Sequence, residues 1–146
     1  MSGFSLLLLL AGLAAAAADT PFTDCGSSST INTLQLTGCN EVPCILHRGK
    51  DLVMDTDITA ASSISSLTSE VQGIISGIPV PFYKDDKACD SLTSASCPLA
   101  SGDTFAYQVS FPVLKEYPTI PVLVRWDLVD EAGGVVACAE IPCKIQ

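Results

Sequence analysis

The stretch Thr104–Leu114, with the sequence TFAYQVSFPVL, carries the clearest alternation of side chains in this chain of 146 residues. Every second residue from Phe105 to Val113 is large and apolar, and the residues between them are mostly small or polar. Successive side chains of a strand point to opposite faces of a sheet, so this period of two predicts a half-buried strand.

The same pattern recurs on both sides of this stretch. In Lys50–Ala60 every second residue from Leu52 to Ile58 can face a core, and Ile120–Leu128 repeats the alternation. Shorter strands are expected at Ile31–Leu36, Ile45–Arg48 and Val135–Ile145, and Ala60–Gln72, whose apolar spacing also fits a helix, is interpreted as a strand. About seven short strands separated by turn signals predict one all-β domain, a sandwich of two antiparallel sheets.

The segment Gly77–Phe82, with the sequence GIPVPF, should lie at the border of a sheet. Pro79 and Pro81 cannot donate backbone hydrogen bonds, and proline in a strand is confined to edges and bulges. We expect Gly73–Phe82 to form this border strand. Its apolar side chains either complete an ordinary core or surround the entrance to a lipid-binding slot between the sheets. Periodicity alone does not distinguish these two arrangements.

The run Leu6–Ala18 is too short to span a bilayer and ends in small residues, as in a secretory signal. We therefore expect a signal peptide at residues 1–18 and a mature domain at residues 19–146. The rest of the sequence contains no hydrophobic run that is long enough to span a bilayer.

The charge balance and the sparse catalytic residue types exclude several functions. The formal net charge is −9 with no Lys/Arg cluster, so neither nucleic acid nor an anionic membrane is an expected partner. The single histidine, His47, has no recognisable catalytic partner, which argues against an enzyme. Asp85 and Asp86 are interpreted as solvated carboxylates, because a calcium site needs six to eight oxygens. No metal and no cofactor are expected.

Seven cysteines behind a signal sequence indicate disulfides and one remaining thiol. Cys39 and Cys44 could close one local ring, and Cys89 and Cys97 another. Cys25 then has either Cys138 or Cys143 as its partner. In the last strand Cys143 shares a face with Ala139, Ile141 and Ile145, so we predict that Cys25 pairs with Cys138 on the outer face and that Cys143 is a buried free thiol.

Six motifs, in order and with compatible spacing, cover essentially the whole mature chain and resemble the Niemann-Pick type C2 group of the ML (lipid-recognition) domain family. They are Asp24–Ser27, the Cys39/Cys44 loop, Gly77–Phe82, Phe111–Pro118, Val124–Trp126 and Cys138–Pro142. The chain departs from vertebrate members at Ala139 and Cys143, where they have Trp and Val.

The resemblance implies an immunoglobulin-like β-sandwich with an internal apolar lipid cavity, the disulfides Cys25–Cys138, Cys39–Cys44 and Cys89–Cys97, and no catalysis. The positions that match lipid-contacting residues of the family are Leu36, Phe82, Tyr107, Val113, Tyr117, Pro118 and Trp126. Among them Phe82, Val113 and Tyr117 fall at the mouth of the cavity.

The expected function is that of a secreted carrier of a sterol or a fatty-acid-like lipid, monomeric and working with a membrane lipid-transfer protein or a receptor. The endosome or lysosome lumen is the alternative destination. The alternative function is an immunoglobulin-like interaction module that presents a lipid to a receptor, as immune co-receptors of this family do.

Overall fold

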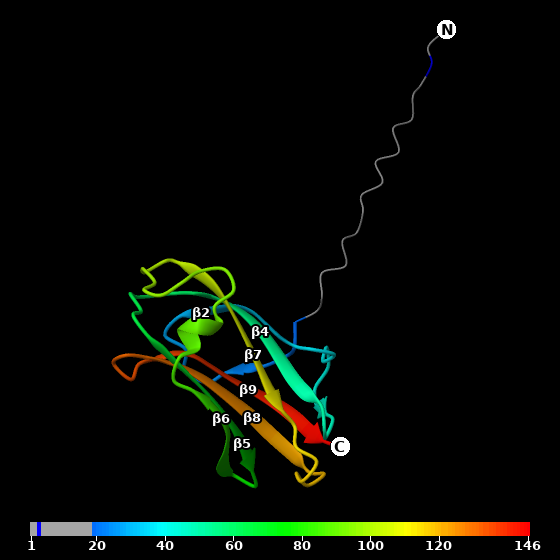
Figure 1. The fold of residues 1–146 in the computed structure, drawn as a ribbon. Helices are drawn as coiled ribbons and strands as arrows, with labels where there is room; N and C mark the ends of the chain where they lie inside the picture. The colour runs from blue at the N-terminus through cyan, green and yellow to red at the C-terminus, as the bar shows by residue number, and fades with distance from the viewer. Residues whose placement is uncertain (1–2, 4–18) are drawn as a thin grey trace.

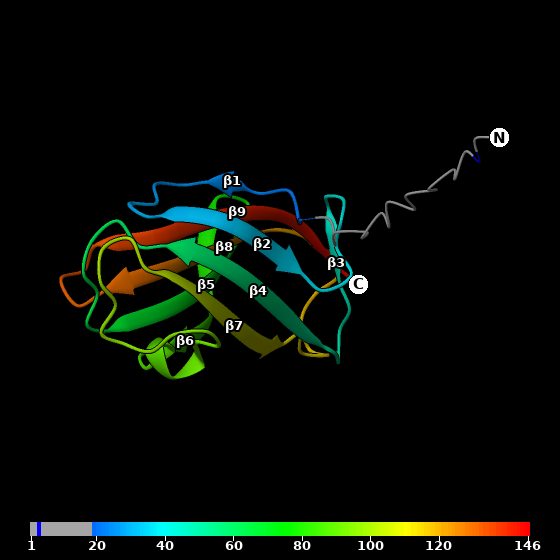
Figure 2. The ribbon, with the colours of Figure 1, turned by 90° about the horizontal axis from the view of Figure 1, so that it is seen from above.

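The computed structural model describes residue 3 and residues 19–146. The expected signal peptide, residues 1–18, lies outside the described residues apart from Gly3. In the described part, nine strands form two sheets that pack face to face (Figures 1 and 2). None of the helices in this part is long and apolar enough to cross a membrane.

The larger sheet contains six strands, and β6 lies at its border. Its order is β1 (Thr23–Asp24), β9 (Val135–Ile145), β8 (Pro121–Asp130), β5 (Leu67–Ile75) and β6 (Ile78–Asp85), with β3 (Cys44–Leu46) parallel to β9. The smaller sheet contains β2 (Thr30–Leu36), β4 (Asp51–Thr59) and β7 (Thr104–Pro112), in this order. A 3-10 helix, η1 (Ala88–Ser91), follows β6.

The core lies between the sheets and follows the alternation of the sequence. In β7 the buried residues are Phe105, Tyr107, Val109 and Phe111, and Val113 is buried just beyond the strand. Strands β4 and β8 bury every second residue in the same way. The prediction of a two-sheet all-β sandwich is therefore confirmed, with β6 as the border strand.

The expected border strand Gly73–Phe82 is wrong in its boundaries. Gly73 belongs to β5, and a turn at Ser76 and Gly77 reverses the chain into β6. Both turn residues have positive φ, 51° and 78°, as a two-residue type I′ hairpin requires. Apolar residues flank this turn on both sides, and the turn signal Ser76-Gly77 between them was interpreted as part of one continuous strand.

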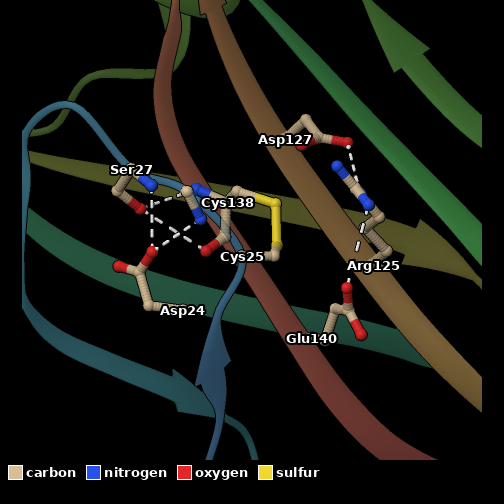
Figure 3. Close-up of a disulfide and its surroundings, with 8 residues drawn as sticks. Asp24, Cys25, Ser27, Arg125, Asp127, Cys138 and Glu140 are labelled. Atoms are coloured by element: carbon tan, nitrogen blue, oxygen red, sulfur yellow. Dashed lines mark hydrogen bonds and ion pairs between the residues drawn. A yellow bond between two sulfur atoms is a disulfide. The ribbon is translucent and has the colours of Figure 1, made fainter.

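Cys25 and Cys138 form a disulfide that ties the first segment of the domain to β9 (Figure 3). Oδ1 of Asp24 accepts hydrogen bonds from the backbone N–H groups of Gly26 and Ser27, both at 2.9 Å. These bonds, led by that from Ser27, stabilise the carboxylate and lower the pKa of Asp24. Ser27 Oγ in turn accepts a bond from the backbone N–H of Cys138 at 2.9 Å, so the disulfide lies in an ordered network.

The other two disulfides join Cys39 to Cys44 and Cys89 to Cys97, so all three pairs are those that the resemblance implies. Cys143 is the free cysteine of the described residues, and its thiol faces the interior with 3% exposure. Burial raises the pKa of this thiol to about 12, because the apolar interior disfavours a thiolate.

Because only a thiolate attacks alkylating reagents, native Cys143 should react with iodoacetamide at least about 100-fold more slowly than a model thiol at pH 8. The raised pKa keeps the thiol protonated at this pH, and its reactivity should still be suppressed at pH 9. Mass spectrometry after timed labelling gives the rate, and unfolding in guanidinium with the disulfides intact should restore ordinary reactivity. Rapid labelling of the native protein would contradict the buried position.

Candidate functional site

A narrow apolar slot opens between the two sheets at the end where β7 finishes and β8 begins. The space inside it that could hold a water molecule is only about 10 Å³, so its own side chains almost fill the slot. The lining residues are Leu46, Val71, Phe82, Phe111, Pro112, Val113, Tyr117, Val122, Val124 and Ile145. All ten are aliphatic or aromatic, so the slot suits hydrocarbon and not a charged group.

The mouth of the slot is formed by two aromatic rings from different parts of the chain. Phe82 comes from β6, and Tyr117 comes from the loop between β7 and β8. Their ring centroids are 5.1 Å apart and their planes are inclined by 63°, an edge-to-face contact. Both side chains are half-buried, so they reach from the surface into the slot.

A β-bulge aims Phe82 inward. Val71 pairs with Tyr83 and the next residue, Gln72, pairs with Pro81, so Phe82 is an extra residue in β6. A bulge breaks the strict alternation of a strand and re-aims a side chain. Phe82 and Tyr83 consequently both pack against the core, and Tyr83 stacks on Phe111 with centroids 6.2 Å apart.

Beyond the slot, an aromatic pair fills the space between the sheets. Tyr107 of β7 and Trp126 of β8 stack with centroids 6.0 Å apart and planes inclined by 12°. Trp126 pairs with the slot residue Val71 across β8 and β5, which places this pair next to the inner end of the slot. Trp126 Nε1 donates a hydrogen bond to Ser69 Oγ at 3.0 Å.

The Tyr107 hydroxyl has no hydrogen-bond partner among the described residues, although the side chain is only 1% exposed. Burial raises the pKa of Tyr107 to about 12, because the apolar surroundings disfavour a phenolate. The hydroxyl therefore stays protonated at neutral pH.

The residues implied by the resemblance fall into three groups in the structure. Phe82, Val113 and Tyr117 come together in the lining of the slot, and Tyr107 and Trp126 lie at its inner end. Leu36 is buried in the core on β2, and Pro118 is exposed beside Tyr117, and neither lines the slot.

The sequence analysis did not identify several of the residues that line the slot. Val122, Val124 and Phe111 lie on predicted inward faces, so alternation marked them as interior without separating slot from core. Leu46 and Ile145 reach the slot because β3 pairs in parallel with β9, a long-range contact that no local pattern indicates.

The family model described as the ML domain matches residues 19–145, nearly all of the described chain. The chain belongs to the ML-domain family. This ML domain is 35% identical to the Drosophila melanogaster protein named NPC intracellular cholesterol transporter 2 homolog a, over 86% of each chain. It is 33% identical to NPC intracellular cholesterol transporter 2 of Bos taurus, over 97% of this chain and 95% of that one.

Among solved structures, a Niemann-Pick type C2 protein from the Japanese carpenter ant superposes with a TM-score of 0.78 at 25% identity. The match covers 86% of this chain and 99% of the ant chain. The sandwich is thus the common architecture of both proteins.

The polar groups of this ML domain do not assemble a recognisable catalytic or metal centre in residues 19–146. His47 is exposed, and Asp86 is exposed with Lys84 Nζ at 3.7 Å from its Oδ1. The one group of potential metal ligands in the described part brings Asp127 near the sulfur atoms of Cys25 and Cys138. Those sulfur atoms are joined in a disulfide and cannot serve as thiolate ligands.

Ser69→Ala should lower the free energy of unfolding by about 1–2 kcal/mol, because it leaves the buried Nε1–H of Trp126 without an acceptor. Urea unfolding followed by circular dichroism measures the change. Adding Ser69→Ala to Trp126→Phe, which has no such donor, should cost less than about 0.5 kcal/mol. Equal costs in both backgrounds would show that the hydrogen bond does not stabilise the fold.

Proposed function

We propose that this chain is a non-catalytic carrier that takes a sterol or a fatty-acid-like lipid out of water and holds its apolar part between the two sheets. The observation that carries the proposal is the slot itself, which opens to the surface and is lined by ten aliphatic and aromatic side chains. The relatives named as cholesterol transporters support the same function.

Uptake of a lipid requires the slot to widen. In the structure the slot is too narrow for a sterol, and the rings of Phe82 and Tyr117 meet at its mouth. Each methylene transferred from water into such a site contributes about 0.8 kcal/mol, so a chain of a dozen carbons can offset the cost of separating side chains that touch across the gap. In this proposal the narrow slot corresponds to the closed state of the carrier.

The lining residues have different roles in this proposal. Phe82, Val113 and Tyr117 surround the entrance, and the Tyr117 hydroxyl can hydrogen-bond to the polar end of the ligand. Val71, Val124 and their neighbours contact the hydrocarbon. Tyr107 and Trp126 limit how deeply the ligand enters.

The proposed localisation of the protein is outside the cytosol. A signal peptide at residues 1–18 and three disulfides are typical of secreted proteins and of proteins in the lumen of endosomes or lysosomes. The protein works as a monomer and delivers its lipid to a membrane lipid-transfer protein or a receptor.

Organic extraction of the protein purified from a secreting eukaryotic host, followed by mass spectrometry, tests the proposal. A lipid present at about one molecule per chain is the expected result. The delipidated protein should then bind the fluorescent sterol dehydroergosterol or oleic acid in titrations. Absence of an extracted lipid together with no binding of either probe would overturn lipid carriage and favour the interaction module.

A further inference from the structure

Gly73 is the point on β5 over which the Phe82 ring lies. A Cβ atom at this position would come within 2.9 Å of both Cδ2 and Cζ of Phe82, and closer still to Cε2. Carbon atoms in contact are normally about 3.5–4.0 Å apart, so the ring could not stay in place above any residue with a side chain. The ring therefore rests directly on the backbone of β5.

The glycine is needed at this position for space and not for backbone conformation. Gly73 lies inside a strand and is not among the residues with positive φ, whereas Gly77 in the adjacent turn has φ of 78°. Glycine inside a strand weakens it and often marks a site where another group approaches closely. Here the approaching group is the aromatic ring at the mouth of the slot.

The position of Gly73 in the sheet connects this contact to the slot. Residues 67, 69, 71 and 73 are the buried positions of β5, so the missing Cβ of Gly73 would point between the sheets. The next inward residue, Val71, lines the slot, and so does Phe82. The Phe82 ring therefore fills the entrance of the slot, in the space next to Val71 that a side chain at position 73 would otherwise occupy.

We propose that Gly73 is the positioning residue of a lipid gate, a seat without a side chain on which the Phe82 ring rests when the slot is closed. The proposal rests on lipid carriage as the proposed function and deepens it. The bulge in β6 aims the ring inward, Gly73 lets it lie against the strand, and Tyr117 holds its edge. When the ring swings away, the space above Gly73 becomes part of the entrance for the lipid.

The gate makes a prediction about the rate of lipid release. With alanine at position 73 the Phe82 ring cannot return to its seat, and the mouth cannot close behind a bound lipid. Gly73→Ala should therefore release a bound sterol about three- to tenfold faster than the wild type, a factor that corresponds to losing one aromatic contact. If residue 82 is small, the methyl group has nothing to displace.

The experiment measures release of dehydroergosterol from the full secreted chain by stopped-flow fluorescence. Energy transfer from the single tryptophan, Trp126, to the sterol reports occupancy. Gly73→Ala is compared with the wild type, and the same substitution is compared in the Phe82→Leu and Phe82→Ala backgrounds. Gly134→Ala is the control for adding a methyl group to a crowded glycine away from the slot. Its Cβ would lie 2.9 Å from Oδ2 of Asp130, in the turn between β8 and β9 at the far end of the sandwich.

The expected effect of Gly73→Ala on the release rate decreases with the size of residue 82, from Phe to Leu to Ala, and is less than about twofold in the last case. If Gly73→Ala alone does not fold, the Leu and Ala backgrounds still give this trend. An effect of the same size in every background, or no effect in any, would overturn the gate while leaving lipid carriage intact. Failure of the wild type to bind the sterol or oleic acid would overturn lipid carriage, and the gate with it.

Discussion

Removing the disulfide between Cys25 and Cys138 is expected to lower the free energy of unfolding by about 5 kcal/mol. The two cysteines are 113 residues apart in sequence, so their bond closes a loop of almost the whole domain and restricts the unfolded chain strongly. A domain of this size is typically stable by only about 5–15 kcal/mol. The variant Cys25→Ala/Cys138→Ala should therefore be close to unfolding at 37 °C.

The disulfide Cys89–Cys97 provides the matched control. It spans only eight residues, for which the same loop-closure relation gives about 2.5 kcal/mol. Guanidinium unfolding of both double-alanine variants, monitored by circular dichroism, measures the two costs. A loss for Cys25→Ala/Cys138→Ala that is no larger than the loss for the control would show that chain entropy does not decide the stability of this domain.

The sequence predicted the sandwich well because most of its strands have one apolar face and one polar face. In β4 and β7 a shift of one residue would bury charged or polar side chains such as Asp55 and Gln108, so only one register is compatible with a core. The β5–β6 hairpin was predicted less well. Apolar residues lie on both sides of the turn, and only the dipeptide Ser76-Gly77, a common turn signal, marks the reversal between them; the sequence analysis passed over this signal.

The site was predictable only in part, because local patterns do not contain its long-range contacts. Resemblance to a family indicated Phe82, Val113 and Tyr117, and all three line the slot. Gly73 gave no signal, because its role depends on a bulge in β6 that places one particular ring above it. Leu36 shares the inward face of its strand but lies in the packed core, a distinction that only the separation of the sheets decides.

Phe82→Ala is expected to weaken binding of dehydroergosterol about 30-fold. The ring is partly exposed in the closed state, and a bound lipid would cover the exposed part, so binding gains apolar burial that alanine cannot supply. A loss of about 2 kcal/mol corresponds to this factor and lies within the range for burying a phenylalanine side chain. Titration of the delipidated protein with the sterol measures the dissociation constant.

The fold should tolerate this substitution better than binding does, since Phe82 extends from an edge strand and packs against the core on one side only. We expect the free energy of unfolding without lipid to fall by about 1 kcal/mol. Val80→Ala is the matched control, because Val80 lies in the same strand and does not line the slot. If Phe82→Ala binds the sterol as tightly as Val80→Ala does, with an intact fold, Phe82 has no part in lipid binding and the entrance must lie elsewhere.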